Sequence, residues 1–224
     1  MRTLLVLSDP GGSSSGGSGA ERYCGWVDGG RGELTVGDFY SNDTVKSVFL
    51  DYIAALLSHT NAITGEEYRF DPAILGWQLG MGPLDPGHPG SNRLKGWVKQ
   101  IAAYVRQRAP HHLISAGADG TFGPSSPHHR RRNGERLPPR SPLHPLAVPP
   151  GMVHDAVCTG SDFYVHSSPW EVDLASFELD PAGRLACGDG CRLQWAREAF
   201  SAHLQYASRS RSSPAALAPG SGPG

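Results

Sequence analysis

The chain has 224 residues, with 20 Lys and Arg against 21 Asp and Glu, so its formal net charge is −1. This balance argues against a nucleic-acid or anionic-membrane binder, which needs a basic face to displace counterions, and no apolar run reaches the roughly 18 residues of a membrane span. Gly (29) and Pro (19) together make up about a fifth of the residues, against an average of roughly 12%, which predicts long irregular stretches.

Three stretches hold most of these irregular residues. Residues 8–20 are a Gly/Ser linker by composition, and residues 123–151 form a loop rich in Pro and Arg. Residues 208–224 contain mainly Ser, Arg, Pro, Gly and Ala and are predicted to be a disordered tail. We therefore expect one ordered region over residues 1–207, interrupted by the linker and the loop.

The first predicted elements are a strand and a helix. Leu4–Leu7 is a short apolar run typical of a buried strand. Between residues 43 and 59, apolar side chains recur with helical spacing, and Asn42 or Asp43 can cap the start of this helix. The apolar positions are Val45, Val48, Phe49, Tyr52, Ile53, Leu56 and Leu57.

The remaining elements continue the alternation. Residues 73–79 are predicted to form a strand that is buried on both faces, followed by a helix. That helix carries Leu94, Trp97, Val98, Ile101, Tyr104 and Val105 on one side. Strands are expected at 112–117 and 172–179, and a last helix over about 189–206. The order indicates an α/β protein with about four parallel strands, which suits a doubly wound sheet or half of a (β/α)8 barrel. The glycines at 16, 17 and 19 lack the spacing of a dinucleotide-binding loop.

Several sequence blocks resemble the plant-type endo-β-1,4-mannanases of glycoside hydrolase family 5. The blocks are residues 38–46, 71–79, 110–125, 160–163 and 172–177, in the family's order. The resemblance covers roughly residues 23–125 and 160–206. It implies a TIM-barrel-like (β/α)8 fold, of which residues 1–207 form a part. It also implies an enzyme that hydrolyses internal β-1,4 bonds of mannans with retention and without a cofactor. Members are typically extracellular, but the apolar run at residues 4–7 is shorter than a signal peptide needs, so localisation stays open.

The catalytic motifs of the family are altered in this sequence. A retaining glycosidase needs two carboxyl groups about 5–5.5 Å apart. The resemblance implies an acid/base Glu within Asn-Glu-Pro after the fourth barrel strand, where this chain has Met81-Gly82-Pro83. The family's His-x-Tyr-Pro at the sixth strand corresponds here to residues 178–181, Glu-Leu-Asp-Pro. The first two strands and the nucleophile strand have no counterpart, so we expect a truncated, catalytically defective member that retains no catalytic residue.

A few residues remain as candidates for a site. Glu178 or Asp180 at the end of a predicted strand, or Asp85 three residues after Gly82, could replace a lost carboxylate, although a solvated loop carboxylate is the simpler interpretation. Trp77 could stack on a sugar, but its place within an apolar strand favours the core.

The cysteines do not predict a metal site. Cys187 and Cys191 are four positions apart, and Cys24 and Cys158 stand alone, whereas zinc needs further ligands at matching spacing. A local disulfide and free thiols both remain open. Asn42-Asp43-Thr44 is a glycosylation sequon, although helix capping already explains Asn42.

Three interpretations of the function stay open. The chain is a defective mannanase, a non-catalytic carbohydrate-binding pseudoenzyme, or an incomplete gene model of a longer active enzyme. A β-mannan-type polysaccharide is the only ligand class expected, without nucleic-acid or membrane partners. Because four strands cannot close an eight-stranded barrel, exposed strand edges predict self-association.

Overall fold

The computed structural model describes residues 2–8, 19–85, 88, 92–126, 128–129, 133, 160–177 and 189–211. The chain divides into two compact units. The first comprises Met1–Arg130 and His154–Leu179, and the second Arg131–Val153 and Asp180–Gly224. The sheet, the hydrophobic core and the pockets considered below all belong to the first unit.

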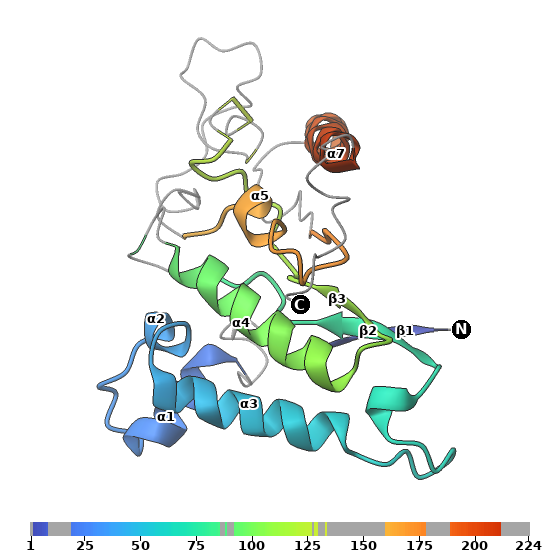
Figure 1. The fold of residues 1–224 in the computed structure, drawn as a ribbon. Helices are drawn as coiled ribbons and strands as arrows, with labels where there is room; N and C mark the ends of the chain where they lie inside the picture. Colours follow the sequence, from blue (N-terminus) through green and yellow to red (C-terminus); the bar gives the residue numbers. More distant parts are fainter. Residues whose placement is uncertain are drawn as a thin grey trace, which may run out of the picture. The chain divides into compact units, whose positions relative to one another are not determined.

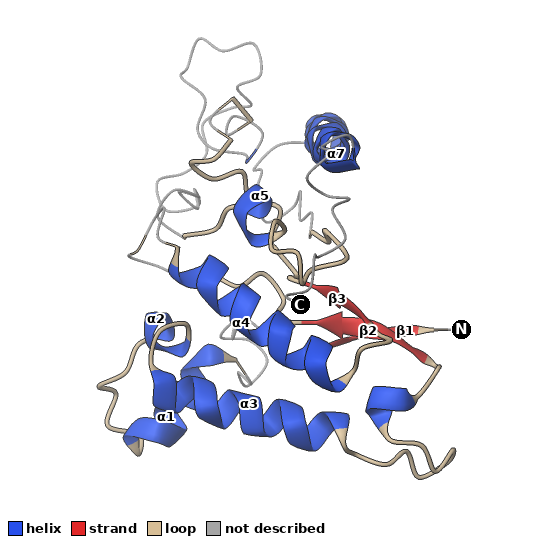
Figure 2. Ribbon diagram, in the orientation of Figure 1, coloured by secondary structure: helices blue, strands red, loops and turns tan. Residues whose placement is uncertain are grey.

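Three parallel strands form the sheet, in the order β1-β2-β3 (Figures 1 and 2). β1 spans Thr3–Val6, β2 spans Ile74–Gln78 and β3 spans Leu113–Ser115. The central strand pairs on both sides, with Trp77 opposite Leu5 of β1 and Ile114 of β3. This arrangement confirms the predicted α/β class with a partial parallel sheet, which is not closed over the described residues.

Along the chain, the helices of the first unit lie between the strands and after β3. Their bounds are Ala20–Asp28 (α1), Val36–Phe39 (α2), Asp43–Leu57 (α3), Arg93–Arg108 (α4) and Phe163–His166 (α5), with a 3-10 turn at Tyr68–Phe70. α3 and α4 are the two helices that the apolar spacing predicted. α3 begins where expected because the Asn42 side chain accepts hydrogen bonds from the backbone N–H groups of Thr44 (2.9 Å) and Val45 (3.2 Å).

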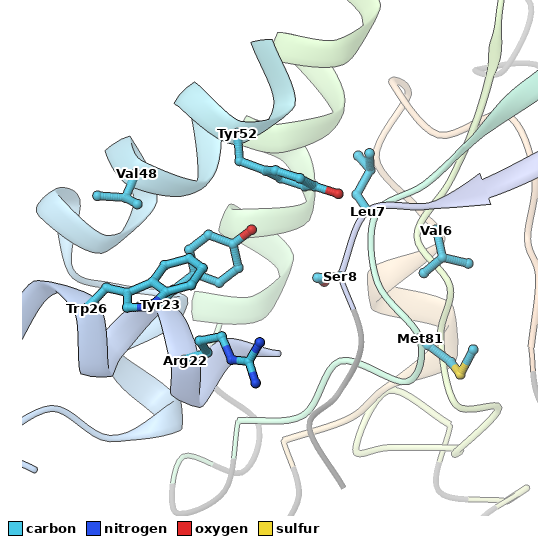
Figure 3. Close-up of a pocket in the computed structure, with 9 residues that line it drawn as sticks. All are labelled: Val6, Leu7, Ser8, Arg22, Tyr23, Trp26, Val48, Tyr52 and Met81. Atoms are coloured by element: carbon cyan, nitrogen blue, oxygen red, sulfur yellow. The ribbon is translucent and has the colours of Figure 1, made fainter. Parts of the chain in front are cut away.

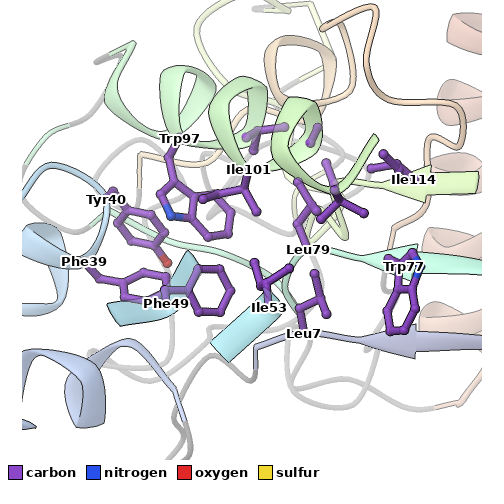
Figure 4. Close-up of a cluster of buried hydrophobic side chains, with 14 of the residues drawn as sticks. Leu7, Phe39, Tyr40, Phe49, Ile53, Trp77, Leu79, Trp97, Ile101 and Ile114 are labelled. Carbon is purple, nitrogen blue, oxygen red and sulfur yellow. The ribbon is translucent and has the colours of Figure 1, made fainter. Parts of the chain in front are cut away.

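The core joins α3 and α4 to the sheet (Figure 4). Its centre is aromatic: the ring centroids of Phe39 and Phe49 are 5.1 Å apart, and Phe49 stacks on Trp97 at 5.9 Å. Leu79 and Ile101 fill the space between these rings and the strands and are fully buried. Aromatic pairs at such distances contribute about 0.5–1.5 kcal/mol beyond their buried area, which holds α2, α3 and α4 together.

The fourth strand expected at residues 172–179 is not a regular strand in the structure. Over its described part, residues 172–177, two isolated parallel bridges join Ser115 to Leu174 and Ala118 to Phe177. The strand is irregular because a side chain replaces a backbone acceptor. The Ile114 N–H donates to Asp173 Oδ2 (2.8 Å) instead of to a carbonyl oxygen. The Asp173 and Leu174 N–H groups both donate to the Ile114 carbonyl, which interrupts the regular ladder.

Helix α7 is the element of the second unit that can be described, and it spans Asp189–Arg211. It confirms the helix expected from residue 189 but continues past residue 206 into the predicted tail. Similarly, Ala20 begins α1 although the linker was predicted to extend to it. Among the helices of the described residues, none is both long and apolar enough to span a membrane.

Candidate functional site

The carboxyl ends of the three strands meet along one hydrogen-bonded rim. In parallel α/β folds, ligands and catalytic groups gather at this edge. The Ser8 hydroxyl donates to the Leu79 carbonyl (3.0 Å), and the Met81 N–H donates to the Ser8 carbonyl (3.0 Å). The Gly82 N–H donates to the Gly117 carbonyl (2.8 Å). The segments after β1, β2 and β3 are thus connected to one another by hydrogen bonds to backbone carbonyl groups.

A small pocket of about 230 Å³ lies at this rim. Its lining comes from β2, the turn after β2, the turn after β3 and the segment that bridges to β3: Gln78, Met81, Gly82, Gly117, Ala118, Ser176 and Phe177. The Ser176 hydroxyl donates to Gln78 Oε1 (3.3 Å), and Gln78 Nε2 donates to the Gly80 carbonyl (3.0 Å). The pocket therefore offers an amide, a hydroxyl and apolar surface, but its described lining contains no carboxyl group.

Gly82 occupies the position where the family resemblance implies the acid/base Glu. Its backbone has φ of +60°, a left-handed conformation that L side chains rarely adopt. A Cβ built at Gly82 would lie 3.4 Å from Asp119 Cβ, so a side chain there would point towards Asp119. The structure thus places a residue without any proton-transferring group at this position, in a backbone conformation that favours glycine.

Asp119 is a carboxylate residue that adjoins this position, and the sequence analysis did not single it out. Its Oδ1 accepts from the Thr121 N–H (3.0 Å) and from the Ser161 hydroxyl, while Oδ2 accepts from the Thr121 hydroxyl (2.7 Å). Both oxygens therefore hold the turn after β3 and connect it to residue 161. The Asp-x-Thr spacing signals the local turn, but the contact with Ser161, 42 positions away, has no sequence signal.

Asp85, one of the carboxylates suggested as replacements, does not line the pocket at the strand ends. Asp85 is fully buried and forms ion pairs with Arg93 (3.4 Å) and, when the imidazole is protonated, His88 (3.2 Å). Arg93 also donates to the Gly37 carbonyl of α2 and to Ser41 Oγ (2.7 Å), so the Asp85 cluster connects α2 to the start of α4. Glu178 and Asp180 lie outside the described residues.

Trp77 is completely buried at the centre of the sheet. Its indole Nε1 donates to His112 Nδ1 (2.9 Å), and His112 Nε2 lies 3.2 Å from the Asp71 carbonyl. Burial lowers the pKa of His112, which favours the neutral imidazole that accepts at Nδ1 and donates at Nε2. With no exposed ring face in this structure, Trp77 offers no stacking surface to a sugar, and its surroundings suit the core interpretation.

A larger pocket of about 440 Å³ lies between β1, α1 and α3 (Figure 3). Its lining is mainly apolar and aromatic, from the three elements and the turn after β2: Val6, Leu7, Ser8, Arg22, Tyr23, Trp26, Val48, Tyr52 and Met81. Arg22 carries the formal charge of this lining. Without a carboxyl group, this pocket does not supply the machinery of a glycosidase either.

The described part of the chain offers no metal centre, since no three His, Cys, Asp or Glu side chains there lie grouped as ligands. Cys24 is a free, buried thiol whose Sγ donates to the Thr35 carbonyl (3.1 Å), and burial raises its pKa to about 11. Cys191 is disulfide-bonded. Cys158 and Cys187 lie outside the described residues.

Comparison with known proteins confirms the resemblance stated from the sequence blocks. Residues 30–133 match the family model for GH family 5 beta-mannosidase-like proteins. This segment of the chain is therefore similar to glycoside hydrolase family 5.

Two plant proteins illustrate what this chain is similar to. It is 30% identical over 188 residues to putative mannan endo-1,4-beta-mannosidase 5 of Oryza sativa subsp. japonica, covering 83% of this chain and 35% of the relative. It is 29% identical over 163 residues to mannan endo-1,4-beta-mannosidase 1 of Arabidopsis thaliana, covering 73% and 34%. The chain thus spans about a third of the length of these curated relatives.

A solved structure shares the fold of this chain. The endo-1,4-beta-D-mannanase from Thermotoga petrophila RKU-1 superposes with a TM-score of 0.72 at 24% identity, covering 93% of this chain and 52% of that one. The match confirms that the three parallel strands and their helices are part of a TIM-barrel-type arrangement.

Proposed function

We propose that this chain derives from a mannan-directed glycosidase and does not hydrolyse β-1,4-mannan by the retaining route. The observation that carries the proposal is Gly82 at the pocket rim, in place of the acid/base Glu that the family resemblance implies. The relatives' names identify them as mannan endo-1,4-beta-mannosidases, which supports a β-mannan-type polysaccharide as the ancestral substrate.

The chemistry of retention explains why this single position matters. One carboxylic acid must protonate the departing glycosidic oxygen, while a second carboxylate about 5–5.5 Å away attacks the anomeric carbon. Glycine can do neither, and a positioned general acid typically contributes about 10²–10⁴ in rate. Asp119 does not substitute for it, because both its oxygens already accept hydrogen bonds from Thr121 and Ser161.

Release of reducing ends from purified β-mannan tests this proposal. The 224-residue chain is expected to release no more than a protein-free blank. Glu178→Gln and Asp119→Asn are compared in parallel and should leave the signal at the blank. Hydrolysis by the unmodified chain that Glu178→Gln abolishes would refute the proposal and identify Glu178 as a working carboxylate.

Binding without hydrolysis is the second candidate function. The pocket at the strand ends combines the Gln78 amide, the Ser176 hydroxyl and the apolar Phe177, a mixture that suits a pyranose with hydroxyl groups and apolar C–H faces. Calorimetric titration with mannan oligosaccharides tests it. Saturable heat that Ser176→Ala and Gln78→Ala both weaken is expected, whereas no heat at millimolar ligand would rule this function out.

A further inference from the structure

A chain of side-chain hydrogen bonds leads from a buried serine to the pocket of about 230 Å³ at the strand ends. It begins at Ser115 of β3, which is fully buried and pairs in register with Gln78 of β2. The Ser115 and Ser176 hydroxyl groups are hydrogen-bonded to each other, and the Ser176 hydroxyl lies 3.3 Å from Gln78 Oε1. Gln78 and Ser176 belong to the described lining of the pocket, and Ser115 does not.

A backbone carbonyl fixes the direction of this chain. Gln78 Nε2 donates to the Gly80 carbonyl (3.0 Å), which can only accept, so the Gln78 atom that faces Ser176 is the amide oxygen. Because that oxygen cannot donate either, the single Ser176 hydroxyl proton points to Gln78, and Ser176 accepts from Ser115. The Gly117 N–H donates to Ser115 Oγ (3.2 Å), which agrees with Ser115 as the donor to Ser176.

This direction decides which polar atoms the pocket offers to a ligand. Within the described residues, both hydroxyl protons are used inside the chain. Ser176 Oγ and Gln78 Oε1 each keep one acceptor position, and Gln78 Nε2 keeps one of its two N–H groups. Two acceptors and one donor suit a ligand hydroxyl, which both donates and accepts. They suit a carboxylate poorly, because a carboxylate only accepts and loses its hydration when it is bound.

The charge beside the pocket acts in the same direction. Gly82 of the lining adjoins Asp119, since a Cβ built at Gly82 would lie 3.4 Å from Asp119 Cβ. Asp119 brings a formal negative charge to this side, and no residue of the described lining carries a positive charge. A bound anion would therefore face a like charge without a compensating cation, which is one way in which a site rejects a ligand.

We propose that Ser115 is a positioning residue, and that the chain it begins makes this pocket selective for a neutral, hydroxyl-donating sugar over the corresponding uronate. Ser115 holds Ser176 in the orientation that reaches Gln78, so the Gln78 amide is fixed before a ligand arrives. The inference rests on the second candidate function given above, binding without hydrolysis.

Calorimetric titration with two trisaccharides tests the ligand class. The probes are β-1,4-mannotriose and the β-1,4-linked trimer of mannuronate, which carries a carboxylate in place of each hydroxymethyl group. We expect mannotriose to bind roughly tenfold more tightly or better at neutral pH, because the described lining does not neutralise the carboxylate of the uronate.

A double-mutant cycle tests the role of Ser115. Ser115→Ala should weaken mannotriose binding by roughly three- to tenfold, and Ser115→Thr, which keeps a hydroxyl, should restore most of the affinity. In a Ser176→Ala background, Ser115→Ala should have no further effect, because the chain is already interrupted. Ser58→Ala is the matched control, since Ser58 is exposed at the end of α3 and its hydroxyl donates to the Ala54 carbonyl (2.9 Å). Circular dichroism verifies that all variants are folded.

The contrary outcomes are distinguishable. Equal affinity for the two trimers, or tighter binding of the uronate, refutes the proposed selectivity while binding itself stands. An equal effect of Ser115→Ala in both backgrounds shows that Ser115 acts through the fold and not through Ser176, which refutes the positioning role. No heat with either trimer overturns the candidate binding function and this inference together.

Discussion

Under the proposed loss of hydrolysis, Gly82 changes the chemistry of one position while the hydrogen bonds of the surrounding rim remain. Its N–H still donates to the Gly117 carbonyl, and Gly117 itself has no room for a side chain, since a Cβ there would lie 1.8 Å from the Gly80 carbonyl oxygen. The turns after β2 and β3 therefore depend on glycine backbone geometry. Restoring a carboxylate at residue 82 requires a change of backbone as well as of side chain.

Gly82→Ala measures this backbone constraint directly. An L residue in the left-handed region costs about 1–2 kcal/mol, so the free energy of unfolding in urea is expected to fall by roughly that amount. Gly96→Ala in α4 is the control, because a Cβ there meets nothing within 4 Å, and it should raise stability by up to about 1 kcal/mol. An unchanged stability in Gly82→Ala would show that the turn accommodates a side chain.

His166 makes stability depend on pH. It is buried in α5, and burial lowers its pKa from 6.5 to about 4, although Asp162 and Asp119 act in the opposite direction. Since the unfolded chain binds this proton more strongly, the contribution is fully present above pH 6.5 and is lost as the pH falls towards 4. The shift corresponds to roughly 3 kcal/mol over that interval.

Urea unfolding at pH 7 and at pH 4.5 checks this dependence. His166→Gln should flatten the loss of stability between the two values, whereas His111→Gln, at an exposed position, should not. Hydrogen bonds from the Asn61 side chain and the Ala73 N–H lower the pKa of Asp71 below its ordinary value of 3.8, so Asp71 titrates below this window. Equal pH dependence in the His166 variant and the unmodified chain would contradict the assignment.

At the scale of elements, the sequence predicted helices correctly where buried apolar residues recur at a regular spacing. α3 and α4 were predicted because Val45, Phe49 and Ile53, like Trp97 and Ile101, recur at helical spacing and are buried. α1 was missed because it follows the Gly/Ser stretch, and α2 and α5 are only four residues long. The site was partly predicted: the motif comparison identified Gly82, whereas the contact of Asp119 with Ser161 depends on tertiary folding.

The cap of α3 is a local element that can be tested by itself. Asn42→Ala removes the acceptor for the N–H groups of Thr44 and Val45 and should cost about 1 kcal/mol of stability. Thr44→Ala removes the same glycosylation sequon but leaves the cap oxygen in place, so a smaller loss is expected. Thermal unfolding of protein produced in bacteria compares the two without a glycan. Equal losses would mean that the cap contributes nothing specific.

Residues 172–179 were predicted to be a strand, because alternating apolar residues do not reveal that a side chain competes for the ladder. Asp173 accepts from the Ile114 N–H and pairs with Arg106, so it connects the segment to β3 and α4. Asp173→Ala should cost about 1–3 kcal/mol, since the Ile114 N–H loses its acceptor. Hydrogen exchange at the Ile114 amide should accelerate. Unchanged exchange there would show that a neighbouring carbonyl replaces the carboxylate.

At the scale of the whole molecule, the chain contains only part of a mannanase-type barrel. The fold matches a mannanase barrel with a TM-score of 0.72, but the chain spans about a third of the length of its plant relatives. Four parallel strand positions are enough to bury a core of aromatic and aliphatic side chains between sheet and helices. They do not by themselves supply two facing carboxylates, which retaining hydrolysis requires.

The initial rate of reducing-end release from β-mannan, followed from pH 4 to 8 at high protein concentration, tests the central claim most directly. A complete family 5 mannanase serves as the positive control, and Gly82→Ala serves as the matched variant of this chain. The account predicts that the chain and its variant both stay at the rate of the protein-free blank throughout. A rate above the blank that is saturable in mannan, has a bell-shaped pH profile and is changed by Gly82→Ala would contradict it.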